Sequence, residues 1–367
     1  MTEQKQQELK KKAEAGDTQA QIELSHALEA KGQDNAAVSW LRTAIAGGDV
    51  RAKTQLAKRF LTRAPLQSEE GTALLFLAAA EGDAEAAHVA AVLYASGIAV
   101  ERDWSVAFDY LTRAAELGFS LAQDELYLLA TGAIERNQGR EPDPAHWKKL
   151  CKAIDLPAWV TTPPQKLVSR DPRIMVVEGA VPSLICDWLI ERAKPHRAAA
   201  SVFDQKTGEL HYSKERTNSV ASFDTFKRDM IFAVLRLRIA SLTGLSFGME
   251  VPNILHYTVG QCYGLHFDFI AATKSDATRL TQGRQRVLTF LLYLNDDYEG
   301  GETCFPRISW QHKGRKGDAM FFWNVDTQGQ PDPKTLHEGS APTKGEKWLF
   351  SQWIQQDTKA SFPHHRT

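Results

Sequence analysis

Small and apolar residues recur along the first third of the chain with the spacing of paired helices. Four alanine-rich stretches of helical type end in a glycine, at positions 16, 48, 82 and 118, and an alanine follows each glycine four residues later. The steps between the glycines are 32, 34 and 36 residues. Glycine ends a helix readily, and alanine lets two helices approach closely. The pattern predicts an all-α solenoid of helical hairpins from the N-terminus to about residue 133.

The pattern changes in the second half of the chain. Five prolines interrupt residues 137–164, where the stretch AHWKKLCKAI predicts one short capping helix. Two more helices are expected, one beginning near Pro182 and one over 226–242. Strand-like runs separated by Gly, Pro, Asn and Asp then take over: PNILHYTV, RVLTFLLYL, GDAMFFWN and EKWLFSQWI. Helices on one side of antiparallel strands predict a barrel or a jelly roll, the double-stranded β-helix.

These changes divide the chain into four expected segments. They are a helical repeat domain over 1–135, a proline-rich connector with a capping helix over 136–170, a second domain over 171–357, and a C-terminal tail over 358–367. The length of 367 residues is more than one compact domain usually holds, which agrees with two globular domains. The hydrophobic share of 43% and the charged share of 24% exclude a disordered, collagenous or coiled-coil chain.

Charge and cysteine usage narrow the functional classes. The chain has 44 basic and 45 acidic residues, a net charge of −1, so neither nucleic acid nor an anionic membrane is expected as a partner. Residues 1–150 carry −5 and the remainder +4. The four cysteines fit neither a disulfide framework nor a zinc motif and are interpreted as reduced thiols. With no signal peptide or membrane span in the pattern, we expect a cytoplasmic protein.

A metal site is suggested by three residues of the second half. His266 and Asp268 are two apart in a strand-like stretch, so their side chains face the same side, and His337 follows 71 residues after His266. Two histidines and one carboxylate form the facial triad of non-haem Fe(II) oxygenases. The pair alone is a weak signal, and its alternative is a chance pattern of exposed residues.

Lys347 strengthens this hypothesis. The period of two places Lys347, Leu349, Ser351 and Trp353 on one face of a strand, where they would line the interior of the second domain. A buried lysine needs a partner charge, and a carboxylate cosubstrate such as 2-oxoglutarate, held by the metal at its other end, would supply it. The alternative is an exposed lysine in a turn, which is the usual place for this residue.

The ordered motifs of residues 172–356 resemble the catalytic domain of the prolyl 4-hydroxylase family of Fe(II)- and 2-oxoglutarate-dependent dioxygenases. The matching stretches are RIASLTGL, HYTVGQCYGLHFDF, RQRVLTFLLYLNDDYEGGETCFP, KGDAMFF and HEGSAPTKGEKWLFSQWI. The resemblance implies that iron is bound by His266, Asp268 and His337, which would form the catalytic centre. It further implies O2 as a second substrate and L-ascorbate as the reductant that restores oxidised iron.

The resemblance also assigns residues to the pocket around the metal. Lys347 would pair with the distal carboxylate of 2-oxoglutarate, and Tyr257, Thr289 and Trp353 would complete the cosubstrate site. Each of these three has a structural alternative, as a hydroxyl that satisfies a backbone group or as a core side chain. Arg216, in the stretch KERTNSVASF, would face the substrate, and its alternative is a solvated arginine.

The third helical unit resembles a Sel1-like repeat of the tetratricopeptide type. Its characteristic positions are Leu93, Tyr94, Gly97, Val100, Asp103, Ala107, Tyr110, Ala114, Ala115 and Gly118. This resemblance implies a scaffold for protein interaction. The alternative, of equal weight, is that the repeats only pack against the second domain.

Together the motifs predict a dioxygenase that hydroxylates a side chain, in the first place a prolyl residue of a protein or peptide, and releases succinate and CO2. The repeats would bind the substrate or a further protein partner. Two alternatives stay open: hydroxylation of a free amino acid or another small molecule, and a non-catalytic adaptor whose oxygenase domain is a relic. The residues that select the substrate are expected in loops near 200–224 and 271–285.

Overall fold

The chain forms two compact units in the computed structural model, which describes residues 3–62, 68–134, 143–203, 210–211, 213–245, 249–270 and 285–355. The first unit consists of Met1–Leu156 with Thr225–Val234, and the second of Pro157–Asp224 with Leu235–Thr367. The expected tail over 358–367, residues 136–142 of the expected connector and residues 271–284 of one expected substrate loop lie outside the described residues.

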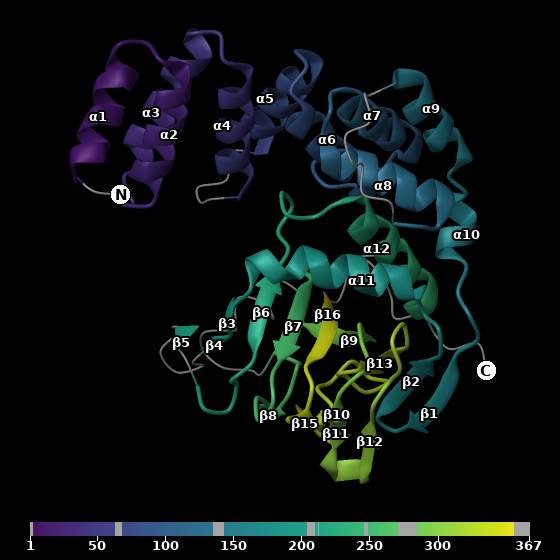
Figure 1. Ribbon diagram of the computed structural model, residues 1–367. Helices are drawn as coiled ribbons and strands as arrows, with labels where there is room; N and C mark the ends of the chain where they lie inside the picture. Colours follow the sequence, from purple (N-terminus) through teal and green to yellow (C-terminus); the bar gives the residue numbers. More distant parts are fainter. Residues whose placement is uncertain are drawn as a thin grey trace. The chain divides into compact units, whose positions relative to one another are not determined.

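The first unit is built of helical hairpins, as predicted (Figure 1). The four glycines of the repeat have φ between 85° and 96°, the left-handed conformation that ends a helix. The alanines that follow them are at most 3% exposed, so neighbouring helices approach closely there. The helices are α1 (Glu3–Glu14), α2 (Thr18–Glu29), α3 (Asp34–Ala46), α4 (Val50–Thr62), α5 (Ser68–Ala80), α6 (Ala84–Ser96), α7 (Trp104–Glu116), α8 (Ser120–Thr131) and α9 (Pro144–Ala153).

The second unit contains antiparallel sheets. The larger sheet has the strand order β1-β2-β13-β9-β16-β7-β6-β3, and the smaller one has the order β12-β11-β14-β8. Two short ribbons, β10-β15 and β4-β5, complete the strands. The strands are β1 (Lys166–Arg170), β2 (Arg173–Val177), β3 (Ala198–Ala199), β4 (Val202–Phe203), β5 (Leu210–His211), β6 (Ser219–Ser222), β7 (Asn253–Tyr257), β8 (Tyr263–His266), β9 (Arg286–Tyr293), β10 (Glu299–Gly300), β11 (Thr303–Phe305), β12 (Trp310–His312), β13 (Ala319–Trp323), β14 (His337–Gly339), β15 (Pro342–Lys344) and β16 (Lys347–Gln355).

The core of the second unit lies between the two main sheets. Strands β2, β7, β9, β13 and β16 of the large sheet and β11 of the small one contribute the following buried cluster: Ile174, Val176, Leu255, Tyr257, Leu291, Tyr293, Phe305, Met320, Phe322 and Leu349. Two sheets with a shared apolar core form a jelly roll, which confirms the predicted fold class. Between the described strands the sheets do not close into a barrel.

Helices accompany the large sheet, with some differences from the sequence prediction. Helix α11 (Ser183–Ala193) begins directly after Pro182, as expected, and lies beside the large sheet in Figure 1. Helix α12 (Met230–Thr243) begins four residues later than predicted, because the carboxylate of Asp229 accepts hydrogen bonds from the N–H groups of Ile231 and Phe232 and so caps the helix. A short helix, α10 (Leu156–Val160), and the strands β1 and β2 were not predicted.

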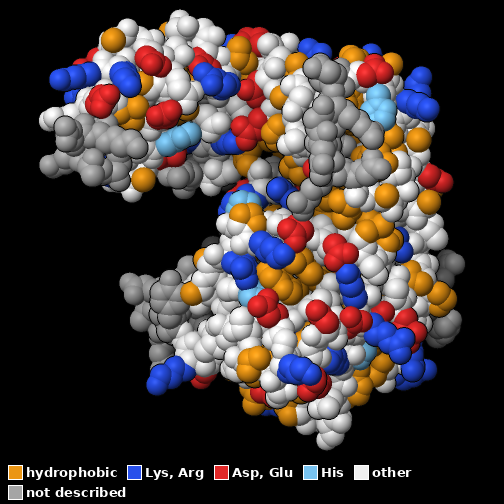
Figure 2. Space-filling view, in the orientation of Figure 1, with side chains coloured by type: hydrophobic (Ala, Val, Ile, Leu, Met, Phe, Trp, Pro, Cys, Tyr) orange, Lys and Arg blue, Asp and Glu red, His pale blue; other side chains and the backbone are white. Residues whose placement is uncertain are grey.

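Surface charge, helix length and the state of the cysteines concern the partners that were expected or excluded from the sequence. Basic and acidic side chains are interspersed on the visible face of each unit (Figure 2). Across the described residues, no helix is both long enough and apolar enough to pass through a lipid bilayer. The four cysteines are free thiols.

Candidate metal centre and pocket

Two histidines stand opposite each other on adjacent strands of the small sheet. His266, at the end of β8, is the antiparallel partner of His337, at the start of β14. Nδ1 of His266 lies 2.7 Å from the carbonyl oxygen of Gly264, and Nδ1 of His337 lies 2.9 Å from that of Thr335. A carbonyl only accepts, so each Nδ1 carries the proton and donates it. Each Nε2 therefore keeps a free lone pair, as a metal ligand requires.

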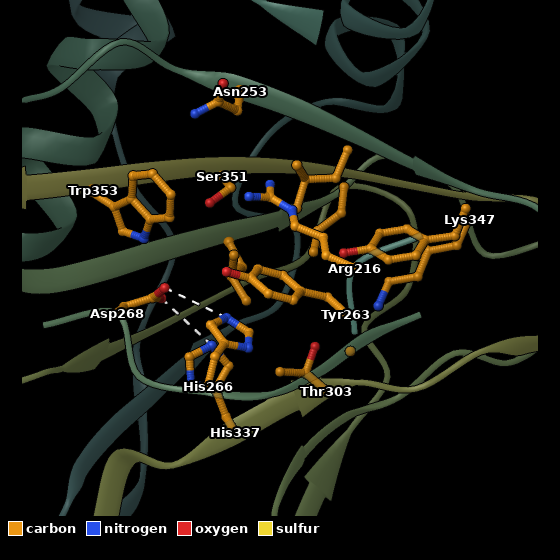
Figure 3. A pocket seen from close by; sticks show the side chains of 15 residues that line it. Arg216, Asn253, Tyr263, His266, Asp268, Thr303, His337, Lys347, Ser351 and Trp353 are labelled. Carbon is orange, nitrogen blue, oxygen red and sulfur yellow. Dashed lines mark ion pairs between the residues drawn. The ribbon is translucent and has the colours of Figure 1, made fainter. Parts of the chain in front are cut away.

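Asp268 completes a cluster of three donors. Its Oδ1 lies 3.6 Å from Nε2 of His266, and its Oδ2 lies 3.5 Å from Nε2 of His337, as the dashed lines of Figure 3 mark. The three ligand atoms are all within 4.8 Å of one another. Within the described ranges this is the one group of three or more such residues arranged so that it could hold a metal ion.

The electrostatics of the cluster favour a divalent cation. Burial and the neighbouring His337 hold the pKa of His266 well below its usual value, so this imidazole is neutral at pH 7. Burial alone would raise the pKa of Asp268. The two neighbouring histidines and the hydrogen bond from the Thr289 hydroxyl outweigh this effect and hold the pKa below its usual value, so the carboxylate is ionised. Nitrogen lone pairs beside one carboxylate suit non-haem Fe(II). The donor set therefore fits this metal.

A pocket of about 470 Å³, its open mouth included, adjoins the three donors. Lys347, Leu349, Ser351 and Trp353 of β16 all line it, which is the shared face predicted from the period of two. The remaining lining comes from neighbouring strands and loops and consists of Arg216, Asn253, Leu255, Tyr257, Tyr263, Leu291, Thr303 and Gly339 beside the three donors.

Lys347 is a buried cation without a counterion. Its side chain is fully buried, its Nζ donates to the carbonyl oxygen of Gly301 at 2.7 Å, and no carboxylate of the described residues forms an ion pair with it. Burial is the main reason why its pKa falls to about 8. The rings of Tyr257 and Tyr293 lie 5.3 Å and 5.9 Å from Nζ. A carboxylate ligand would compensate this charge.

Trp353 lies at the opposite end of the pocket from Lys347, near Asp268 (Figure 3). Its indole Nε1 is buried and has no hydrogen-bond partner among the described residues. The guanidinium of Arg286 stacks 3.6 Å above the indole ring and is itself held by both carboxylate oxygens of Glu250, at 2.7 Å and 2.9 Å. The unused N–H at one end and the uncompensated ammonium at the other fit an elongated ligand with oxygen atoms at both ends.

The structure brings most of the predicted pocket residues together. Tyr257, Lys347, Trp353 and Arg216 line the pocket. Thr289 is not among the lining residues, because its hydroxyl turns to Asp268 and donates to Oδ2 at 2.7 Å. Arg216 packs over the ring of Tyr263 at 4.4 Å and is half-buried.

Several residues around the donors were not singled out from the sequence. Tyr263 stacks on His266 with ring centroids 3.5 Å apart. Its place three residues before His266 in a strand-like stretch was the available signal. Asn324 donates to Thr289, and the side chain of Gln285 bonds the N–H and the C=O of Ile270, two residues after Asp268. No sequence pattern marks these two amides, since their partners are set by strand pairing.

The chain is similar to several known proteins. The family model described as the 2OG-Fe(II) oxygenase superfamily matches residues 252–355. Prolyl 4-hydroxylase 1 of Arabidopsis thaliana is 34% identical over 206 residues, which cover 52% of this chain and 71% of that protein. Among solved structures, a viral collagen prolyl hydroxylase from Paramecium Bursaria Chlorella virus-1, in a complex with 2OG, is similar with 24% identity and a TM-score of 0.39, covering 50% of this chain and 95% of that one. A Sel1 repeat protein from Oxalobacter formigenes is similar with 30% identity and a TM-score of 0.29, covering 32% and 94%.

Proposed function

Because the chain belongs to the prolyl 4-hydroxylase family of 2OG-Fe(II) oxygenases, and is thus a 2-oxoglutarate-dependent dioxygenase, we propose that it hydroxylates a prolyl residue of a protein or peptide. The reaction would release succinate and CO2. The observation that supports this most is the cluster of His266, Asp268 and His337 at the edge of a pocket whose far end holds a buried, unpaired lysine.

The three donors would hold Fe(II), the metal of this family. When bound, the iron together with 2-oxoglutarate and O2 supplies the oxidation chemistry. The chain's own task is to present two Nε2 lone pairs and one ionised carboxylate at fixed positions. The carbonyl groups of Gly264 and Thr335 serve this task by fixing the imidazole tautomers.

Lys347 would bind the distal carboxylate of 2-oxoglutarate. The ammonium has been moved out of water without a carboxylate partner, so an anionic ligand gains the full attraction of an unshared charge. Leu255, Leu291 and Leu349 make the walls of the pocket apolar and exclude water. Burial raises the pKa of Tyr257, so its phenol stays neutral beside this site.

The residues at the metal end have different roles in this proposal. Trp353 would offer its free indole N–H to a ligand atom at the Asp268 end of the pocket. Thr289 would act on the site through Asp268, to which its hydroxyl donates. Arg216, which lines the pocket and packs on Tyr263, would face the substrate.

The remaining assignments are proposals that rest on the sequence motifs. The catalytic domain would comprise 171–357, and the repeats of 1–135 would bind the substrate protein or another partner, since stacked helical hairpins offer extended surfaces. L-Ascorbate would restore oxidised iron, and the protein would act in the cytoplasm.

Succinate release from 2-oxoglutarate, measured with purified iron-loaded protein, tests the metal assignment. His266→Ala and Asp268→Ala should reduce turnover to background, whereas the control His146→Ala, on α9 of the first unit, should leave it unchanged. Full turnover in either of the first two variants would refute the assignment. Mass spectrometry of a treated cell lysate then tests the substrate class, because a gain of one oxygen on a peptidyl proline is expected only of a protein hydroxylase.

A further inference from the structure

We propose that Asn324 and Thr289 form a hydrogen-bond relay that positions Asp268 and thereby sets the affinity of the site for its metal. This inference rests on the proposed role of Asp268 as a metal ligand. Neither Asn324 nor Thr289 lines the pocket. Among the described residues, neither side chain forms a hydrogen bond with the two histidines. Both are therefore positioning residues that act through Asp268.

The relay crosses two neighbouring strands of the large sheet. Nδ2 of Asn324 donates to Oγ1 of Thr289 at 2.9 Å, and Oγ1 of Thr289 donates to Oδ2 of Asp268 at 2.7 Å. Thr289 lies in β9, and Asn324 directly follows β13, which pairs with β9. The three side chains are between 0% and 4% exposed, so water does not compete for these bonds.

The chemistry of the three groups gives the relay one direction. An ionised carboxylate only accepts, so the single hydroxyl proton of Thr289 must go to Asp268. The oxygen of Thr289 can then only accept, which requires Asn324 to present its NH2 group. In this orientation Oδ1 of Asn324 is buried without a hydrogen-bond partner. An unsatisfied buried oxygen costs free energy. The amide of Asn324 nevertheless adopts this orientation, because the opposite one would place its Oδ1 against Oγ1 of Thr289, and both atoms would then be acceptors without a proton between them.

Asp268 needs such support because of its place in the chain. It lies two residues beyond the end of β8, so no ladder of backbone hydrogen bonds holds its segment. Two side chains do so instead: Gln285 anchors the main chain of Ile270, and Thr289 anchors the carboxylate itself. Hydrogen bonds to the ligands of a metal fix their orientation, and their loss typically weakens metal binding about 10- to 100-fold.

Titration of Co(II) into the metal-free protein, with both units present, by isothermal titration calorimetry tests the relay without any measurement of turnover. Thr289→Val keeps the shape but removes the hydroxyl, and Asn324→Asp places a carboxylate that competes for the hydroxyl proton. Both should bind Co(II) about 10- to 100-fold more weakly than the wild type. Thr289→Ser, which keeps the hydroxyl, should bind within about threefold of the wild type, a change smaller than the lower limit of that range.

Thr54→Val is the matched control, because Thr54 is a buried threonine of α4 in the first unit and should not affect Co(II) binding. The thermal unfolding midpoint of each metal-free variant separates a misfolded protein from a displaced ligand. If Thr289→Val does not fold, Asn324→Asp decides. Wild-type affinity in the folded Thr289→Val or Asn324→Asp variant overturns the relay but leaves the proposed function intact. No Co(II) binding by the wild type overturns the metal role and the relay together.

Discussion

Raising the pH from 7 to 9 should weaken the binding of 2-oxoglutarate about tenfold through the deprotonation of Lys347. Burial lowers the pKa of this lysine from 10.5 to about 8 in the free protein. A bound carboxylate favours the ammonium and raises the pKa again. The affinity is therefore close to its full value at pH 7, falls to about half at pH 8 and decreases further as the pH rises above the pKa of the free protein.

The magnitude follows from the same pKa. At pH 9 only about one Lys347 side chain in ten carries its proton, so the affinity falls about tenfold, with a further factor of about ten for each pH unit above that. The depressed pKa also means that burying the ammonium costs about 3 kcal/mol at neutral pH. Because the unfolded chain binds a proton that the folded chain lacks, the stability of the free protein should rise with pH between about 8 and 10.5.

The dissociation constant of 2-oxoglutarate, measured by anaerobic titration calorimetry with Mn(II)-loaded protein at several pH values, checks this prediction. Lys347→Arg is the comparison, since a guanidinium stays protonated throughout this range and its binding should vary little with pH. Identical pH profiles of the wild type and Lys347→Arg would refute the reasoning, because the dependence would then come from another group.

Three substitutions should change the stability of the protein, each measured by urea unfolding at pH 7 without metal. Lys347→Met should raise the free energy of unfolding by about 2 kcal/mol, because it removes the buried charge. The control Lys344→Met, at an exposed position, should change this free energy by less than about 0.5 kcal/mol. A destabilised Lys347→Met variant would contradict the cost of burial derived above. Gly345→Ala should lower it by about 1–3 kcal/mol, since φ is +75° and a Cβ atom would lie 2.7 Å from the carbonyl oxygen of Asp297; an unchanged midpoint would show that this turn relaxes freely. Asp83→Ala should lower it by about 1 kcal/mol through loss of the N-cap of α6, and equal stability would mean that the cap is dispensable.

The repeat architecture could be predicted from the sequence because its determinants are local. A glycine that ends a helix and an alanine at a close helix contact act through neighbouring residues, so their spacing alone predicted the hairpins. The burial of Lys347 was predicted in a similar way, from the alternation of side chains along one strand, and the structure confirms that the side chain is fully buried. The start of α12 lies four residues after the predicted one because the side chain of Asp229 caps the helix there.

The position of Thr289 shows where local patterns stop being informative. Thr289 and Leu291 are two residues apart on β9, and Leu291 lines the pocket while Thr289 does not. The difference arises because Asp268, 21 residues earlier in the chain, meets the hydroxyl of Thr289. Asn324 is a still harder case, since its partner depends on the register between β13 and β9. Such contacts are products of the tertiary fold and leave no periodic trace in the sequence.

The hydrogen bonds between Gln285 and Ile270 act as a clasp that closes the chain at both ends of the 14 residues 271–284. The position of Asp268 relative to β9 is set by this clasp and by Thr289. Two side-chain hydrogen bonds thus do here what a backbone ladder does within a sheet, because they hold the segment that follows Asp268 beside the start of β9.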